Sequence, residues 1–321
     1  MKLMVQIPCF NEEQTIAQTI KSIPRSIPGV DKVEILVVDD GSSDKSIEKA
    51  KSAGADHILA LGKRQGLARA FLKGLEKALE LGADIIVNID ADNQYPGEEI
   101  PRLIEPILNQ SADIVVGERK LKELPNYSSI RLFLQKLGSW FLGILAGEKI
   151  KDGASGFRAL SRESALRLCV LSDFTYTLET LIEAGRQKLR IAWVEVRVNP
   201  QPGRKSRLYS SVPQYLFRSI EAMIRTYSRY EPLKVFSLIG SLIFLGGFGI
   251  GVWFLYYYFT AGGKGHIQIL LLGAILMIIG FQVILIGLVS DLIAGNRKLL
   301  EELIYRLRKI EFAKEKKEKN Q

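Results

Sequence analysis

The stretch IIVNIDADNQYP, residues 85–96, decides the fold and places the chemistry. It begins as an apolar run typical of a buried strand. It then delivers Asp90, Asp92, Asn93 and Gln94, which all carry oxygen in their side chains. A buried strand that ends in two carboxylates predicts a functional site at the end of that strand.

Short segments rich in valine and isoleucine alternate with helix-period segments through the first half of the chain. This alternation predicts an α/β fold, a mostly parallel sheet with helices on both faces. Pro101 fits a first helical turn, whereas Pro106 predicts that its helix is kinked or short. The predicted strands are 3–8, 33–40, 57–61, 84–90 and 113–117, and the predicted helices cover about 12–23, 43–53, 66–81 and 97–110.

Polar clusters follow three of these predicted strands. Ligands of open α/β sheets bind beyond the carboxyl ends of the strands, so three acidic clusters at such ends indicate a site more than solvated loops. The clusters are Asn11 and Glu12 after the first strand, Asp39 and Asp40 at the end of the second, and Asp90 and Asp92 at the end of the fourth.

Asp90 and Asp92 flank a single residue, so both carboxylates can point at one metal ion. Oxygen ligands without histidine or cysteine favour Mg²⁺ or Mn²⁺ over zinc, and substrate phosphates commonly complete the shell of such ions. Gln94 is expected to add an oxygen directly or through water. His57 and His266 are isolated in the sequence, which argues against a histidine-based metal site or catalytic triad.

Two segments near the C-terminus carry no ionised side chain, residues 235–259 and 267–290. Each would form about 36 Å of helix, enough for a hydrocarbon core of about 30 Å. Buried core helices are the alternative, but helices of that length usually show a polar stripe. The seven residues 260–266 between the segments predict a transmembrane helical hairpin.

Basic residues crowd both ends of this predicted hairpin, which makes that side cytoplasmic by the positive-inside rule. They are Arg218, Arg225, Arg229 and Lys234 before it, and Arg297, Lys298, Arg306, Arg308 and Lys309 after it. The chain enters a strand pattern at Leu3 without a signal peptide, so we expect a cytoplasmic N-terminal domain on an integral protein of the cytoplasmic (inner) membrane. Cys9 and Cys169 belong to no cysteine motif, which fits a protein of a reducing compartment such as the cytosol.

The chain has a net charge of +9 in 321 residues, and much of the positive excess lies beside the predicted membrane spans. Basic residues beside membrane segments indicate anionic lipid as the partner, and they argue against nucleic acid. Residues 128–146 and 211–230 have amphipathic helical patterns, which fit either core-facing helices or helices in the membrane interface. The tail KEKKEKNQ, residues 314–321, is expected to be disordered.

The phosphate-binding motifs of P-loop and dinucleotide-binding proteins are absent from the sequence. GKRQG, residues 62–66, is basic and bounded by glycines, so it is either a phosphate contact or an ordinary surface loop.

Six motifs in order resemble those of inverting glycosyltransferases of the GT-A fold. They are IPCFNEEQTI, VVDDGSSD, RQGLARAFLKG, NIDADNQYP, VGERK and DGASGFRALSRE, within residues 7–163. The closest resemblance is to polyprenyl-phosphate glycosyltransferases, the group of dolichol-phosphate mannose synthase and bactoprenol glucosyltransferase. It implies a metal-dependent enzyme that transfers one sugar from a nucleotide-sugar donor, UDP-glucose-like or GDP-mannose-like, to a polyprenyl phosphate.

The resemblance also implies roles for particular residues. The nucleotide is expected to contact Pro8, Glu12, Asp39 and Asp40, and the metal on the donor diphosphate is expected to contact Asp90, Asp92 and Gln94. Arg119 and Arg131 would face the acceptor phosphate, Asp152 would lie near the reacting centre, and Arg204 and Lys205 would lie in a basic loop, PGRKSRL, over the diphosphate.

Alternatives stay open for two of these residues. Asp152 fits either an orienting group or a turn aspartate before Gly153, and Arg131 fits either a phosphate ligand or a solvated helix face. DGASGFR, where DPTSGFR-like text is usual, and Gln135, where a small hydroxyl residue is expected, leave the acceptor contacts and the sugar open.

Two other functions compete with this interpretation. A processive polysaccharide synthase would carry a Q-x-x-R-W segment and more spans, and QKLGSW at 135–140 has neither the spacing nor the arginine. A non-catalytic lipid-phosphate-binding protein would be expected to lose the metal-binding residues, which are intact.

The sequence thus predicts a catalytic domain at 1–210, juxtamembrane amphipathic helices at 211–232, two transmembrane helices within 233–294 and a basic cytoplasmic tail at 295–321. The small-residue run GGFGIG, residues 246–251, predicts a homo-oligomer that associates through the spans.

Overall fold

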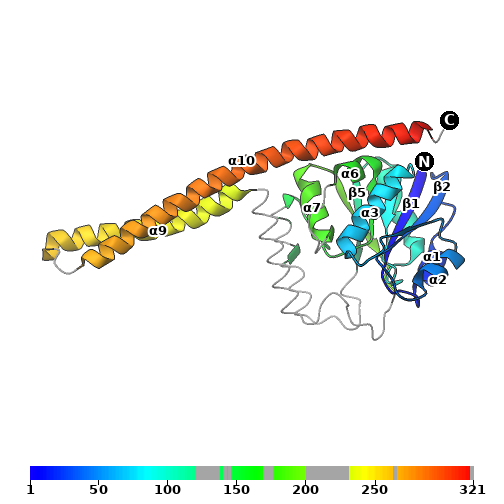
Figure 1. The fold of residues 1–321 in the computed structure, drawn as a ribbon, viewed down its shortest axis with the longest axis horizontal. Helices are drawn as coiled ribbons and strands as arrows, with labels where there is room; N and C mark the ends of the chain where they lie inside the picture. The colour runs from blue at the N-terminus through cyan, green and yellow to red at the C-terminus, as the bar shows by residue number, and fades with distance from the viewer. Residues whose placement is uncertain are drawn as a thin grey trace. The chain divides into compact units, whose positions relative to one another are not determined.

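A computed structural model describes residues 1–119, 138–139, 143, 146–168, 176–199, 231–262 and 266–318 (Figure 1). The chain forms two compact units, one of Met1–Leu208 with Ile304–Gln321 and one of Tyr209–Leu303. The elements of the first unit are β1 (Lys2–Cys9), α1 (Ile16–Ser22), β2 (Lys32–Asp39), α2 (Ser46–Ser52), β3 (His57–Ala60), α3 (Leu67–Glu80), β4 (Ile85–Asn88), η1 (Gly97–Glu99), α4 (Ile100–Leu108), β5 (Ile114–Arg119), β6 (Arg158–Ser161), α6 (Arg162–Arg167), α7 (Tyr176–Arg186) and β7 (Ile191–Val196).

The strands form one seven-stranded sheet in the order β3-β2-β1-β4-β6-β5-β7. β1 pairs in parallel with β2 and β4, and β5 pairs in parallel with β7. β6 is antiparallel to both β4 and β5, so a single reversed strand joins the two parallel parts. The five predicted strands and the mostly parallel sheet are confirmed, whereas β6 and β7 were not predicted.

Side chains of β1 alternate between two helical layers, as the two-residue period of a strand requires. Leu3, Val5 and Ile7 enter one continuous apolar core with residues of α1 and α4. Gln6 points to the other face, where its Nε2 donates a hydrogen bond to the carbonyl of Phe71 in α3. Helices therefore cover both faces of the sheet, as predicted.

α4 is short, as its prolines predicted. A proline lies in its first turn, and Pro106 lies inside the helix two residues before it ends at Leu108. Its buried residues Ile100, Leu103, Ile104 and Ile107 recur at helical spacing and face the sheet core. This packing keeps the residues on either side of Pro106 helical.

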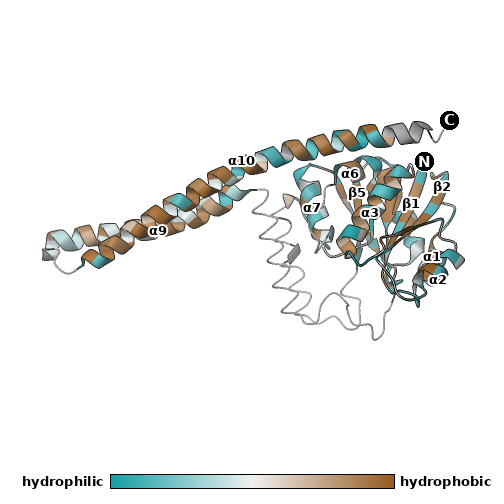
Figure 2. Ribbon diagram, in the orientation of Figure 1, coloured by the Kyte–Doolittle hydropathy of each residue, from teal (hydrophilic) through white to brown (hydrophobic). Residues whose placement is uncertain are grey.

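The second unit contains two long apolar helices, α9 (Pro232–Ala261) and the greater part of α10 (Ile267–Glu318), which are brown over much of their length in Figure 2. Both are long and apolar enough to cross a membrane. Glycines bring the two helices together: a Cβ atom on Gly280 would lie 2.5 Å from the backbone nitrogen of Phe244, and one on Gly240 would lie 2.6 Å from the carbonyl oxygen of Gly280. The predicted hairpin is therefore confirmed, with close backbone contact between its helices.

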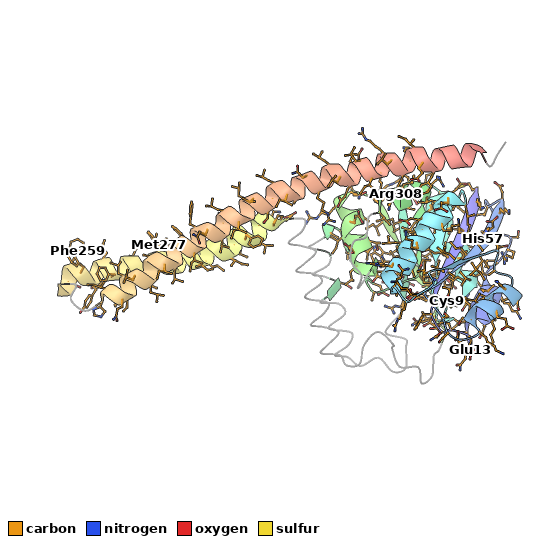
Figure 3. The ribbon with its side chains drawn as sticks, in the orientation of Figure 1. Cys9, Glu13, His57, Phe259, Met277 and Arg308 are labelled. Atoms are coloured by element: carbon orange, nitrogen blue, oxygen red, sulfur yellow. The ribbon has the colours of Figure 1, made fainter. Side chains whose placement is uncertain are left out.

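The end of α10 belongs to the first unit and packs on α6. The Tyr305 hydroxyl donates to Glu163 Oε1 at 2.5 Å, and the Arg167 guanidinium lies 4.2 Å above the Tyr305 ring. Arg308, labelled in Figure 3, donates from Nη1 to the carbonyl of Leu168 at 2.9 Å. The expectation of a disordered tail from residue 314 was wrong as far as Glu318, because α10 continues to that residue.

Candidate active site

The three acidic clusters lie at the carboxyl ends of adjacent strands. β1 lies between β2 and β4, with Cys9 paired in register with Asp39 of β2 and Gln6 paired with Asn88 of β4. The segments that carry Glu12, Asp40 and Asp90 therefore leave the sheet side by side. This arrangement follows from the parallel pairing of β2, β1 and β4, and the sequence predicted it.

Asp90 and Asp92 form a pair of like charges at this edge. Burial, followed by the neighbouring Asp92 carboxylate, raises the pKa of Asp90 to about 7, and Glu12 acts in the same direction. Arg119 and Arg158 oppose that shift without cancelling it. The site thus concentrates negative charge that a cation would relieve.

The loop that carries Asp92 is held by a bond of its own backbone and by Asn199, which lies just beyond the end of β7. The Gln94 N–H donates to Asp92 Oδ1 at 3.0 Å, and Asn93 adopts a left-handed φ of 58°. Asn199 donates its own N–H to the Gln94 carbonyl at 2.8 Å and its side-chain Nδ2 to the Asn93 carbonyl at 2.9 Å. Gln94 therefore orders the loop through its backbone, in addition to any role of its side chain.

The residues predicted to cradle a nucleotide also hold the strand ends in place. Asp40 accepts hydrogen bonds from the N–H groups of Gln65 at 2.6 Å and Gly66 at 2.9 Å, which fixes the loop before α3. Asp39 accepts from the N–H of Ser42 at 3.1 Å. The GKRQG loop at residues 62–66 therefore lies at the same edge as the carboxylates, which favours its interpretation as part of the site.

Two further residues of the predicted cradle lie at the end of β1. Pro8 is buried in β1 opposite Val38, and Glu12 accepts a hydrogen bond from the Thr15 hydroxyl at 3.2 Å. Cys9, labelled in Figure 3, is buried between them, and burial raises the pKa of its thiol to about 11. The Cys9 side chain is therefore a protonated thiol at neutral pH and not a thiolate nucleophile.

Asp152 and Arg119 form a two-point ion pair. The Arg119 Nε donates to Asp152 Oδ2 at 2.8 Å and its Nη2 donates to Oδ1 at 2.9 Å, while the Asp152 side chain is almost fully buried. Both oxygens of Asp152 are thus engaged by one guanidinium. This geometry favours the orienting interpretation of Asp152, because the carboxylate fixes the direction in which Arg119 points.

A buried polar layer lies behind the carboxylates, and the sequence did not predict it. Asn88 Nδ2 donates to the Gly156 carbonyl at 2.8 Å and to the Tyr176 hydroxyl at 3.0 Å. A Cβ atom on Gly156 would lie 2.8 Å from Asp90 Oδ2 and 2.9 Å from the Tyr176 hydroxyl, so Asp90 and Tyr176 converge on this glycine. An asparagine inside the apolar run IIVN was the available signal, because buried strands rarely keep an amide without a partner.

Arg158 adds a buried positive charge to this layer. It is 1% exposed, and its guanidinium donates to the carbonyls of Ser155 at 2.9 Å and Gly153 at 3.2 Å and to the Thr180 hydroxyl. Burial lowers the pKa of Arg158 to about 10, which leaves it protonated at neutral pH. Its charge therefore acts on Asp90 and Asp152 from within the protein.

The donor set at Asp90 and Asp92 fits a hard divalent cation. Across the residues that the structure describes, no group of three or more histidine, cysteine, aspartate or glutamate side chains could hold a metal ion. Two neighbouring carboxylates, of which Asp90 has a pKa raised by burial and by the charge of Asp92, instead suit an ion that takes its remaining ligands from a bound phosphate or from water. Three other predicted site residues, Arg131, Arg204 and Lys205, and the amphipathic segments 128–146 and 211–230 lie wholly or mostly outside the described residues.

Two parts of the chain match the models of known protein families. Residues 4–168 match the model of glycosyl transferase family 2, and residues 231–295 match the GtrB C-terminal hairpin. The chain is 30% identical to the dolichol-phosphate mannosyltransferase of Pyrococcus furiosus over 280 residues, which cover 84% of this chain and 76% of that protein.

Two more distant proteins agree with this match. The undecaprenyl-phosphate 4-deoxy-4-formamido-L-arabinose transferase of Salmonella choleraesuis is 26% identical, with 95% of this chain and 94% of that protein covered. A crystal structure of glucosyl-3-phosphoglycerate synthase from Mycobacterium tuberculosis with Mn²⁺, UDP-glucose and glycerol 3-phosphate has a TM-score of 0.52 and 25% identity, over 71% of this chain and 79% of that chain. Sheet, hairpin and relatives together show that the chain belongs to glycosyl transferase family 2, within its polyprenyl-phosphate glycosyltransferases.

Proposed function

We propose that the protein transfers a single sugar from a nucleoside-diphosphate sugar to a polyprenyl phosphate, with inversion at the sugar carbon. The observation that carries this proposal is the meeting of Glu12, Asp90 and Asp92 at adjacent strand ends, where the pKa of Asp90 is raised to about 7. A site that crowded with negative charge suits a donor diphosphate that brings a divalent cation with it. The relatives named for dolichol and undecaprenyl phosphates support a lipid phosphate as the acceptor.

Asp90 and Asp92 would hold Mg²⁺ or Mn²⁺, with Gln94 completing the loop. A cation there would offset the negative charge that develops on the leaving diphosphate. Asp39, Asp40 and the GKRQG loop would bind the nucleoside part of the donor, since they form the adjoining strand end. The metal-bound structure of the mycobacterial synthase, which contains Mn²⁺ and UDP-glucose, supports this assignment.

Arg119 would receive the acceptor phosphate, oriented by Asp152. A phosphate monoester is already anionic at neutral pH, so its oxygen needs little help from a general base. Asp152 would keep the guanidinium aligned, and Pro8 would shape the floor of the nucleotide site. Arg131, Arg204 and Lys205 are proposed to add positive charge around the two phosphate groups.

The reaction would take place at the cytoplasmic face of the inner membrane. Basic residues follow the α10 span, among them Arg297 and Lys298, and Lys234 lies at the start of α9. An excess of lysine and arginine beside both ends of a hairpin favours the cytoplasmic side. The acceptor phosphate would then meet the site at the membrane surface.

Association of copies through the spans is a further proposal. Gly247 packs against α10, whereas Gly246, Gly249 and Gly251 have open space around them and are available for contact with another copy. Gln282 is exposed on α10, and an amide in hydrocarbon gains by pairing with another polar group. Cysteine substitution at Gly249 should give crosslinked dimers in native membranes, and only monomer would contradict this proposal.

The function is tested by supplying the purified full-length chain with undecaprenyl or dolichyl phosphate and a panel of radiolabelled UDP- and GDP-sugars in the presence of Mg²⁺ or Mn²⁺. Label from one donor should become extractable with the lipid, which would identify the sugar. Binding of a nucleotide without lipid-linked label from any donor would mean a different acceptor. Failure to bind any nucleotide would contradict the proposed function.

A further inference from the structure

We propose that Asn199 is a positioning residue that holds the Asp92 carboxylate in place for a divalent cation. The inference rests on the proposed metal site but concerns a residue far from it in the sequence. Asn199 follows β7, the strand at the opposite end of the sheet order from β3. Its two hydrogen bonds reach residues that precede it by more than one hundred positions.

The turn at residues 92–94 is held by a local bond and by contacts from outside it. Asn93 has a left-handed φ of 58°, a conformation that asparagine adopts more readily than most residues other than glycine. In that turn the Gln94 N–H points back to Asp92 Oδ1 at 3.0 Å, so the direction of the carboxylate depends on the orientation of the Asn93–Gln94 peptide. A contact from outside the turn restrains this peptide further.

Asn199 supplies that contact on both sides of the peptide. Its side-chain Nδ2 donates to the Asn93 carbonyl at 2.9 Å, and its backbone N–H donates to the Gln94 carbonyl at 2.8 Å. The Asn93 carbonyl belongs to the same peptide group as the Gln94 N–H. The amide of Asn199 therefore holds one end of the peptide whose other end orients Asp92.

A second contact ties the same segment to the following turn. Arg197 Nε donates to Glu99 Oε1 at 2.5 Å, and Glu99 is 1% exposed. This ion pair anchors residues 197–199 beyond the metal loop without touching residues 92–94. Arg197 thus offers a matched control, because its loss should loosen the anchor while leaving the Asn199 contact to the turn intact.

The inference predicts a loss of metal affinity that does not follow stability. Removing a residue that orients a metal ligand commonly weakens affinity by 10- to 100-fold. Asn199→Ala and the near-isosteric Asn199→Leu should each raise the Mn²⁺ dissociation constant about 10-fold, and Asn199→Gln, which keeps an amide donor, should recover part of that loss. The KM for the donor should rise with it, whereas the KM for the lipid phosphate should not change.

The experiment titrates Mn²⁺ alone into the purified full-length protein and follows the free ion by electron paramagnetic resonance, with thermal unfolding measured on the same samples. Arg197→Ala should lower Tm while Mn²⁺ affinity stays within about twofold of the unmodified protein, and Asp92→Ala should abolish tight binding. Unchanged Mn²⁺ affinity in Asn199→Leu, or equal losses in Asn199→Leu and Arg197→Ala, would overturn the role of Asn199. Absence of Mn²⁺ binding by the unmodified protein, both alone and with UDP or GDP added, would overturn the metal site as well.

Discussion

The carboxyl-terminal edge of the sheet and the α9–α10 hairpin are held together by opposite means. At the sheet edge, polar atoms meet specific partners: Asp40 accepts two backbone N–H groups, and Asp152 accepts two N–H groups of Arg119. In the hairpin, the helices meet where side chains are missing, at Gly240 and Gly280.

The difference reflects the two surroundings. In the first unit, burial of apolar residues drives folding, so polar contacts are left to define geometry. Between helices in lipid, apolar burial does not favour one contact over another, and close backbone approach decides which faces meet. A small substitution at the sheet edge should therefore reduce activity. A small substitution in the hairpin should instead weaken the packing of its two helices.

Among the substitutions that compare the two regions, the largest effect is expected from Gly156→Ala. The added Cβ would lie 2.8 Å from Asp90 Oδ2, so the carboxylate must move. Misplacement of a reacting group by about 1 Å can cost about 100-fold in rate, and we expect kcat/KM to fall by about that factor. Sugar transfer and Tm should be measured together.

Gly74→Ala is the matched control for that change. Its Cβ would lie 2.6 Å from Gln6 Oε1, which belongs to a side chain one hydrogen bond further from Asp90 than Gly156 is, since Gln6 Nε2 donates to Asn88 Oδ1 at 3.0 Å. Gly74→Ala should lower Tm. For the same fall in Tm, its kcat/KM should decrease much less than that of Gly156→Ala. Equal losses of activity in the two variants at equal Tm would show that the sheet edge responds to general destabilisation only.

Gly280→Ala tests the hairpin half of the comparison. Its Cβ would lie 2.5 Å from the Phe244 nitrogen and 2.7 Å from the Gly240 carbonyl oxygen, both backbone atoms that cannot rotate away. Overpacking of this kind costs about 1–3 kcal/mol, so the Tm of the detergent-solubilised protein should fall. Gly295→Ala makes the same change in α10 where no atom lies within 4 Å. If both variants lower Tm equally, the close glycine contact does not hold the hairpin.

The Glu34 carboxylate makes a pH-dependent contribution to the stability of the first unit, away from the site. Burial acts to raise its pKa, but hydrogen bonds from Lys2, Lys32 and His57 outweigh burial and lower it to about 2. A carboxylate with a depressed folded-state pKa stabilises the protein above its ordinary pKa of 4.5 and loses that contribution as the pH falls towards 2.

Glu34→Gln should therefore lower Tm at neutral pH and have progressively less effect as the pH falls below about 4.5. The contribution should be about 1–2 kcal/mol at neutral pH, because Lys32 is exposed and its interaction is screened. Thermal unfolding of both proteins from pH 7 to pH 3 measures this difference. A gap in Tm that stays constant over that range would contradict the assigned interactions.

The smallest effect is expected from Tyr305→Phe. This change removes the hydroxyl that donates to Glu163 and accepts from Lys309 Nζ at 2.9 Å, but it keeps the ring beneath Arg167. Glu163 is 46% exposed, so solvent screens these bonds and their loss should cost about 0.5–1 kcal/mol, which lowers Tm by a few degrees at most. Tyr256, which is 71% exposed, gives the control Tyr256→Phe. A Tyr305→Phe protein as stable as that control would mean that the bonds of this hydroxyl to Glu163 and Lys309 contribute little.

The parallel part of the sheet was predictable because each strand carries its own signal. β1, β2, β3, β4 and β5 are short apolar runs between helical patterns, and parallel strands place their carboxyl ends together. β6 escaped prediction because its four residues include the buried Arg158, which reads as polar in a sequence. β7 does begin with four apolar residues, 191–194, so its signal was present in the sequence and was missed, although Glu195 interrupts the run and most of the strand is only half-buried.

The site residues on strand ends were predictable, whereas their partners were not. Asp152 and Arg119 are separated by 33 positions, and no local pattern indicates that they form an ion pair. Asn199 carries no signal, since its role exists only through a contact with residues 93 and 94. The tail from residue 314 was misjudged because lysine and glutamate indicate solvation, yet both are good helix formers.

The most direct test of the central claim compares lipid-linked sugar formation by the unmodified protein, by Asp92→Ala and by the unmodified protein with EDTA. We expect transfer by the unmodified protein with Mg²⁺ or Mn²⁺, a loss of at least about 100-fold in Asp92→Ala, and a loss with EDTA that added Mn²⁺ reverses. Full activity of Asp92→Ala, or of the EDTA-treated protein, would contradict the proposal that the sheet edge holds a metal against the donor diphosphate.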